Sequence, residues 1–195
     1  AAAQTDFYVR QGLYAQAIPA GEKLVDNCKS WKRKPRYNFM LSQLYLKENQ
    51  DAQAMYALKK AARFNFNYEM VFNAKINMAL AYQTGAVGKK LNKMLRDPKN
   101  VDFKDRIYYA LGNIEEKKGN EPEAIDLYWK SVRSSVENDN QQALSFYKLG
   151  DYYFKNRDYI MAQSCYDSCL FAMDSRYEDY EKLRALVTDL TSLVV

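Results

Sequence analysis

Histidine is absent from this sequence of 195 residues. Imidazole is the usual general base of nucleophilic catalysis and the commonest transition-metal ligand, so its absence excludes Ser-His-Asp and Cys-His catalytic groups and histidine-containing metal sites. The sequence also lacks a Gly-rich phosphate loop and a Ser-centred nucleophile elbow. It therefore predicts a protein that is not an enzyme and that holds no metal and no cofactor.

Glycine, proline and cysteine are scarce, at seven, four and three residues. So few Gly and Pro argue against a loop-rich β architecture, and an odd number of cysteines does not indicate a disulfide framework. Cys165 and Cys169 lie one helical turn apart and are expected to pack against a neighbouring helix. No apolar run approaches the ~18 residues that span a bilayer, and residues 1–10 lack the order of a signal peptide. We therefore expect a helical chain without a membrane span.

The clearest positive feature is an internal repeat with a spacing of 38 residues. The recurring residues are Tyr108, Leu111, Gly112, Ala124 and Tyr128 in one copy and Phe146, Leu149, Gly150, Ala162 and Tyr166 in the next. Large residues, a Leu-Gly pair and a small residue at helical intervals resemble the tetratricopeptide repeat, a hairpin of two antiparallel helices of ~34 residues. The resemblance predicts an all-α, right-handed superhelical solenoid of such hairpins with a C-terminal capping helix. The extra residues are expected in a turn at 137–142.

The repeats predict one domain over the whole chain, because each hairpin buries its apolar face only against its neighbours. The predicted units are 1–34 (partial), 35–71, 72–104 (degenerate), 105–142, 143–175 and a capping helix at 176–195. The basic stretch 29–36, which contains Pro35, is expected to form the turn before the second repeat. Asn120 followed by Glu123 predicts a capping box at the start of a helix.

Gly112 and Gly150 are both expected inside helices, where Gly costs ~1 kcal/mol relative to Ala. The same cost at two equivalent positions indicates that two helices cross closely there. We predict that Gly112→Leu forces the hairpin apart and destabilises the fold by a few kcal/mol, as overpacking of a core does.

The first helix of each tetratricopeptide hairpin lines the concave surface of the solenoid. Helical spacing from the Leu-Gly pairs assigns to this surface Tyr109, Asn113, Lys117, Tyr147, Asp151, Phe154 and Lys155. These residues predict a groove that binds another protein as an extended peptide or a helix. An ordinary solvated face is the alternative interpretation. A carrier or sensor of a small ligand or cell-wall fragment, using the same groove, is the alternative function.

Charge is unevenly distributed along the chain. Residues 1–104 hold 18 Lys and Arg against 8 Asp and Glu, whereas residues 105–195 hold 11 against 16. A basic adaptor for nucleic acid or anionic lipid is therefore a further alternative. Nucleic acid is the less favoured partner, because no RNA-binding signature accompanies the basic residues. The sequence does not predict an oligomeric state.

Four segments extend the resemblance beyond the generic repeat. They are YNFMLSQLYLKENQDAQAM (37–55), NFNYEMVFNAKINMALAY (65–82), LNKMLRDPKNVDFKDRIYYALGNIEEKKGNEPEAI (91–125) and QQALSFYKLGDYYF (141–154). They resemble the tetratricopeptide lipoproteins of gliding motility and type IX secretion in Bacteroidota, the SprE/PorW family. The resemblance implies a non-catalytic scaffold at the periplasmic face of the outer membrane, and a cytoplasmic protein stays open as the alternative. The chain lacks the family's lipid-bearing Cys, so we expect an excised repeat domain that would reach a membrane only through that absent anchor.

Overall fold

The computed structural model describes residues 1–63, 68–81, 86–175 and 179–194. Within these residues the secondary structure is entirely helical, which confirms the all-α class. The elements are α1 (Ala2–Arg10), α2 (Tyr14–Asp26), α3 (Lys34–Lys47), α4 (Asp51–Ala62), α5 (Tyr68–Ala81), α6 (Ala86–Leu95), the 3-10 helix η1 (Pro98–Phe103), α7 (Lys104–Lys117), α8 (Glu121–Ser134), α9 (Asp139–Lys155), α10 (Tyr159–Ala172) and α11 (Tyr180–Val194). They form two compact units, Ala1–Gln83 and Thr84–Val195.

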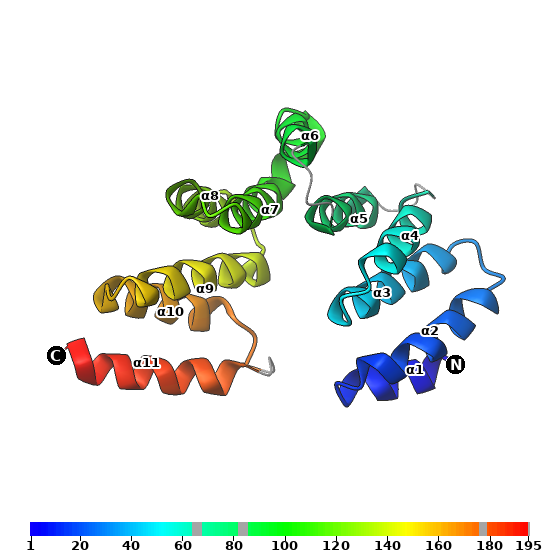
Figure 1. Ribbon diagram of the computed structural model, residues 1–195, viewed down its shortest axis with the longest axis horizontal. Helices are drawn as coiled ribbons and strands as arrows, with labels where there is room; N and C mark the ends of the chain where they lie inside the picture. The colour runs from blue at the N-terminus through cyan, green and yellow to red at the C-terminus, as the bar shows by residue number, and fades with distance from the viewer. Residues whose placement is uncertain (64–67, 82–85, 176–178, 195) are drawn as a thin grey trace. The chain divides into compact units, whose positions relative to one another are not determined.

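The first unit contains α1 to α5, and within it the packed pairs of consecutive helices are α1/α2, α2/α3, α3/α4 and α4/α5 (Figure 1). One of its core clusters joins α2, α3 and α4 through buried residues such as Ile18, Leu41 and Ala57. Pro35 was expected in a turn, but it lies in the first turn of α3. A proline is tolerated there because the first N–H groups of a helix have no partner within the helix.

The second unit contains α6 to α11, and its hairpins α7/α8 and α9/α10 carry the clear repeats. The C-terminal helix α11 packs against α10 and buries Leu183, Val187 and Leu190 in a shared cluster. This is the expected capping helix, although residues 176–178 and 195 of its predicted range lie outside the described residues. Consecutive packed helix pairs are thus confirmed, and the right-handed superhelical path of the whole chain stays a prediction.

The two repeat glycines lie where the ring of a tyrosine on the second helix covers the first helix. A Cβ added at Gly112 would stand 2.6 Å from Cε1 and 2.8 Å from Cδ1 of Tyr128. At Gly150 the added Cβ would stand closer still to the ring of Tyr166. These separations are far inside van der Waals contact, and both tyrosines are buried. The close approach inferred from the glycines is therefore confirmed.

Two local predictions of the repeat analysis are wrong. Helix α8 begins after Asn120 as expected, but the Asn120 side chain makes no cap and donates from Nδ2 to Glu115 Oε2 at 3.2 Å. The capping box is not formed, because the Asn120 backbone N–H that Glu123 would bond already donates to the Glu115 carbonyl at 3.0 Å. The extra residues between the repeats do not all lie in a turn either, since 139–142 form the first turn of α9, with Asn138 as its cap.

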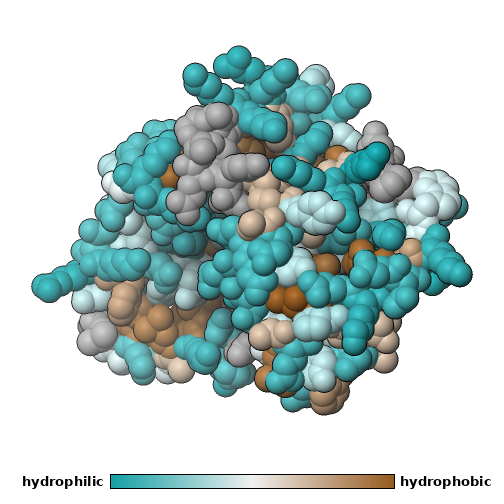
Figure 2. Space-filling model, turned by 45° about the vertical axis from the view of Figure 1, so that its right-hand side comes forward, coloured by the Kyte–Doolittle hydropathy of each residue, from teal (hydrophilic) through white to brown (hydrophobic). Residues whose placement is uncertain are grey.

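A membrane span would show in the composition of the described helices, and a hydrophobic binding site could show on the face drawn in Figure 2. None of the helices in the described ranges has the length and the apolar composition that crossing a membrane requires. On the face drawn in Figure 2, hydrophilic residues make up most of the surface and hydrophobic residues gather in small areas. Since scattered exposed apolar residues are normal on proteins, hydropathy on this face does not single out a binding site.

Candidate functional site

The candidate site lies on the first helices of the two clear hairpins and is called here the α7–α9 face. It comprises Tyr109, Asn113, Glu116 and Lys117 of α7 and Tyr147, Lys148, Asp151, Phe154 and Lys155 of α9. The two helices contact each other directly within the second unit. Their outward side chains therefore share one surface.

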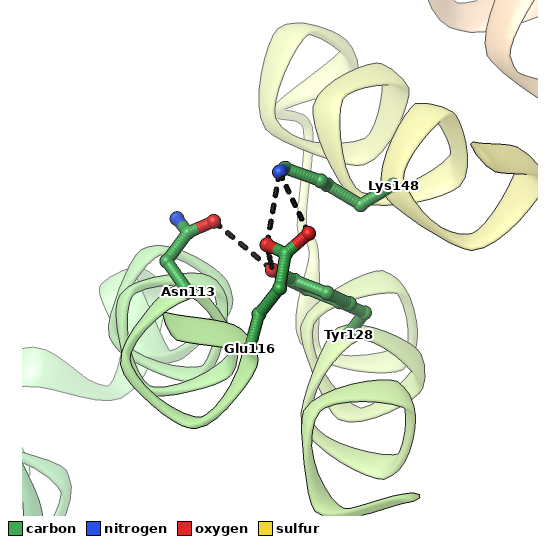
Figure 3. Close-up of polar contacts among 4 residues, drawn as sticks. All are labelled: Asn113, Glu116, Tyr128 and Lys148. Carbon is green, nitrogen blue, oxygen red and sulfur yellow. Dashed lines mark hydrogen bonds and ion pairs between the residues drawn. The ribbon is translucent and has the colours of Figure 1, made fainter. Parts of the chain in front are cut away.

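The Gly112–Tyr128 contact positions the polar groups at one end of this face. With its ring over Gly112, Tyr128 reaches across α7, and its hydroxyl donates to Glu116 Oε2 at 2.7 Å (Figure 3). The same hydroxyl oxygen lies 3.0 Å from Asn113 Oδ1. Burial, and then the hydrogen bond to Glu116, raise the pKa of Tyr128, so the phenol stays protonated and donates at neutral pH.

Glu116 also joins the two helices of the face. Lys148 Nζ of α9 lies 2.9 Å from Glu116 Oε2 and 3.2 Å from Oε1 (Figure 3). Burial by itself would raise the pKa of Glu116, but the hydrogen bonds from Tyr128 and Lys148 outweigh it and hold the pKa below its usual value. A partly exposed ion pair of this kind contributes about 0.5–1 kcal/mol, so it orients side chains more than it holds the fold.

The next repeat keeps the tyrosine and changes the charges. Tyr166 OH donates to Asp151 Oδ1 at 2.8 Å, and Asp151 occupies the repeat position of Asn113. Phe154 occupies the position of Glu116, so this copy presents an aromatic ring where the first presents a carboxylate. One end of the face therefore carries the Glu116–Lys148 ion pair, and the other end carries the Asp151 carboxylate with aromatic rings.

The seven predicted residues fall into three groups in the structure. Asn113 and Asp151 are half-buried beside the repeat tyrosines: Asp151 accepts from the Tyr166 hydroxyl, and Asn113 Oδ1 lies 3.0 Å from the Tyr128 hydroxyl oxygen. Lys117 and Lys155 are exposed. The aromatic residues are less alike. Tyr109 is half-buried against Tyr128, with ring centroids 5.7 Å apart.

Tyr147 and Phe154 are the aromatic side chains of this face that are open to a partner. Each is 38% exposed. The Tyr147 ring lies 6.1 Å from that of Tyr166, and the Phe154 ring lies 5.8 Å from that of Tyr159, which are ordinary distances for tilted or edge-to-face aromatic pairs. Both rings are therefore held by a neighbouring ring while one side stays accessible. That these residues bind a partner stays a prediction.

Glu116 and Lys148 were missed by the sequence analysis. Glu116 follows Asn113 by three residues, and Lys148 precedes Asp151 by three, so helical spacing places both on the predicted face. In the first copy the prediction stepped by four residues, from Tyr109 to Asn113 and Lys117, and so passed over Glu116. Counting the i+3 and i−3 neighbours of Asn113 and Asp151 would have placed Glu116 and Lys148 on the face, although not their pairing.

A buried polar cluster fixes where the two helices of the face begin. Asp105, which is 0% exposed, accepts from the backbone N–H of Arg106 at 2.7 Å and from Asn138 Nδ2 at 2.7 Å. Ser131 Oγ of α8 donates to the Asp105 carbonyl at 2.8 Å and lies 2.8 Å from Ser145 Oγ of α9. Burial raises the pKa of Asp105, and these hydrogen bonds offset only part of that effect. The cluster ties α7, α8 and α9 together.

The buried cysteines of the second unit are packing residues. Burial raises the pKa of Cys165 to about 11 and that of Cys169 to about 12, so both are neutral thiols at physiological pH. Among the residues that the structure describes, no group of three or more His, Cys, Asp or Glu side chains could hold a metal ion.

Comparison with known proteins adds little to this picture. No protein-family model matches the sequence, and a search of curated proteins finds no match. Among solved structures the chain is similar to one described as the crystal structure of MamA, with 17% sequence identity and a TM-score of 0.49. The similarity covers 86% of this chain and 93% of that one. At this level it supports no statement about function.

Proposed function

We propose that this chain is a non-catalytic scaffold that binds other proteins, and that the α7–α9 face is its docking surface. The observation that carries the proposal is the Glu116–Lys148 pair across two consecutive hairpins, with exposed Tyr147 and Phe154 beside it. Tyr and Phe rings are among the residue types that the cores of protein interfaces are enriched in, and the charged side chains near them suit the polar rim of an interface.

An extended peptide or a helix is the form of partner that fits this face. The side chains of the face follow α7 and α9 in steps of three and four residues, so they offer contacts along a line rather than around a point. Lys117, Lys148 and Lys155 supply donors, and Glu116 and Asp151 supply acceptors. We expect a partner that presents a carboxylate near the lysines and an apolar side chain near Phe154.

We further propose that the scaffold works in the cell envelope, as a component of gliding-motility and type IX secretion machinery attached to the periplasmic face of the outer membrane. The support is the resemblance of the segments 37–55, 65–82, 91–125 and 141–154 to the lipoproteins of that family. The upstream coding sequence tests the attachment. A signal peptide that ends in a small-residue run and a Cys is the expected finding, and an open reading frame that continues into a cytoplasmic domain would contradict it.

The docking face is tested by a pull-down from the membrane and periplasmic fractions of the source organism. Tyr147→Ala combined with Phe154→Ala should lose the captured partner while circular dichroism stays helical, because each ring leaves one side accessible at the surface. Phe171→Ala is the matched control, since Phe171 is an aromatic residue of α10 that is 96% exposed. Loss of capture by the control, or full capture by the double variant, would move the interface off the α7–α9 face.

A further inference from the structure

The first unit contains a cleft that the repeat face does not explain. It lies between α2, α3 and α4 and has a volume of about 450 Å³. Its floor is apolar, with Val25, Leu41 and Ala57. The polar and aromatic residues that line it are Glu22, Asp26, Asn38, Tyr45, Gln53, Tyr56 and Lys60.

The second unit fills the equivalent junction with its own side chains. Tyr153 of α9 follows the Leu-Gly pair as Tyr45 follows Leu41 and Ser42 in α3. Trp129 of α8 donates from Nε1 to the Tyr153 hydroxyl at 3.3 Å, and its ring lies edge-on to Phe146 at 6.1 Å. Two aromatic rings therefore occupy this place in the second unit.

In the first unit, both rings are replaced by shorter polar residues. Glu22 of α2 takes the contact that Trp129 makes, because the Tyr45 hydroxyl donates to Glu22 Oε1 at 2.6 Å. Asn38 takes the repeat position of Phe146, three residues before the leucine of the repeat. The cleft is thus a repeat junction without its aromatic filling, and its walls carry oxygen atoms instead.

The free polar atoms of the walls are mainly acceptors. Within the described residues, neither Glu22 nor Asp26 forms an ion pair. Asn38 is 4% exposed, and its Nδ2 donates to the Lys34 carbonyl at 2.8 Å, which leaves Oδ1 as an acceptor without a hydrogen bond in the described part of the chain. Burial, with Glu22 and then Asp26, raises the pKa of Tyr45, so this hydroxyl stays bonded to Glu22. A ligand for this cleft must bring N–H donors and positive charge.

One wall also offers an aromatic face for a cation. Tyr56 is 63% exposed, and Lys60 Nζ lies 4.3 Å from the centroid of its ring. The ring is therefore already a cation–π partner, held by the protein's own lysine. A flat cation that stacks on Tyr56 would displace the Lys60 ammonium toward solvent.

We propose that this cleft binds an arginine side chain presented by an extended segment of a protein partner. A guanidinium group is planar, carries five N–H donors and stacks on aromatic rings, whereas an ammonium group is a compact, strongly hydrated charge. The apolar floor takes the three methylenes of the arginine stem. The flat cation takes the place that aromatic rings fill in the second unit, and it meets the carboxylates of Glu22 and Asp26.

The ligand is tested with short capped peptides, acetyl-Gly-Arg-Gly-amide and its lysine and citrulline analogues. A single arginine side chain should bind with a dissociation constant on the order of 1–10 mM, which backbone-amide NMR titration of the whole chain can follow. The expected result is saturable shifts in α2 and α4 with the arginine peptide, weaker binding of the lysine peptide and none of the citrulline peptide. Equal binding of arginine and citrulline would overturn the proposal.

Variants locate the binding in the cleft. Glu22→Gln and Asp26→Asn should each weaken the arginine peptide about three- to fivefold, since each removes one exposed charge pair. Asn38→Phe restores a ring in the junction and should abolish binding. Glu48→Gln, a carboxylate outside the cleft, is the matched control and should leave the affinity unchanged.

Lys60→Gln distinguishes the proposal from a site for an anion. Because Lys60 competes for the Tyr56 ring, its removal should tighten the arginine peptide about twofold to threefold. Weaker binding by Lys60→Gln, or unchanged binding by both carboxylate variants, would show that the cleft does not select a guanidinium. Thermal unfolding followed by circular dichroism establishes that each variant is folded. The cleft lies in the first unit, so failure of this proposal would leave the proposed α7–α9 face untouched.

Discussion

Gly112→Ala is the substitution whose effect follows most directly from the packing of the repeats. The new Cβ would stand 2.6 Å from Tyr128 Cε1 and 2.8 Å from Cδ1. The Tyr128 ring is 3% exposed, and its hydroxyl is bonded to Glu116, so the ring has little room to move. Overpacking of this kind costs about 1–3 kcal/mol.

Helix propensity acts in the opposite direction. Replacing Gly by Ala inside a helix stabilises it by about 1 kcal/mol. The two effects leave Gly112→Ala about 1 kcal/mol less stable than wild type. Gly112→Leu adds more atoms at the same contact and should cost about 3 kcal/mol or more.

Gly88→Ala is the matched control for this prediction. Gly88 lies in α6, and an added Cβ would meet no atom within 4 Å. Only the propensity effect remains, so Gly88→Ala should stabilise the chain by up to about 1 kcal/mol. Urea unfolding followed by circular dichroism at 222 nm measures both variants. If Gly112→Ala stabilises the chain as much as Gly88→Ala, the steric explanation of the repeat glycines is wrong.

The first unit supplies a natural rescue of the clash. Ser42 occupies the position of Gly112, and buried Leu58 stands where Tyr128 does. Transferring this pair, Gly112→Ser with Tyr128→Leu, should cost less than the sum of the two single changes. A double-mutant cycle should give a favourable coupling of about 1 kcal/mol. Strict additivity would contradict direct contact as the reason for the pairing.

Three further outcomes follow from the pKa shifts. Burial raises the pKa of Asp105, so the ionised form of this carboxyl weakens the fold. Asp105→Asn should therefore gain stability relative to wild type as the pH rises from 4 to 7. Urea midpoints of the two proteins that change in parallel with pH would refute this. The pKa of Glu116 is lowered although the side chain is partly desolvated, so this carboxylate contributes about 0.5–1 kcal/mol to the free energy of unfolding above its usual pKa and loses that contribution on acidification. The difference in stability between wild type and Glu116→Gln should therefore close as the pH falls from 7 to 3. Because Cys165 and Cys169 are buried and their pKa values are raised, a maleimide at pH 7 should label only Cys28 in the native chain and all three thiols in urea. Rapid labelling of all three thiols in the native chain would contradict the packing.

The repeat pattern was enough to predict how the helices of the second unit pair. Gly112 and Tyr128 recur as Gly150 and Tyr166. Because Gly is unfavourable inside a helix, its presence at two equivalent helical positions already indicates that a neighbouring group packs too closely for a side chain. The start of α8 after Asn120 was also predicted. Its missing cap was not, because the helix pattern does not show that both the backbone N–H and the side-chain amide of Asn120 bond to Glu115 at the end of α7.

The cross-hairpin contacts could not be derived from spacing alone. The Glu116–Lys148 pair joins residues 32 positions apart, and it depends on how closely α7 and α9 approach each other. Asp105 goes against the general rule that carboxylates stay at the surface, so only the observed partners Asn138 and Ser135 explain its burial. The spacing of residues in the sequence predicts which face of a helix a side chain lies on. Which residue of another helix it contacts depends on how the helices pack, and only the structure shows that.

The central claim is that a partner protein docks on the α7–α9 face, and site-specific photocrosslinking in cells tests it most directly. A benzophenone amino acid placed at Tyr147 or Phe154 should form a covalent adduct with the partner, and one placed at Phe171 should not. All three positions carry exposed aromatic residues, so the probe replaces a similar side chain in each case. Adducts from the α9 positions alone are the expected result, and adducts from Phe171 alone would contradict the account.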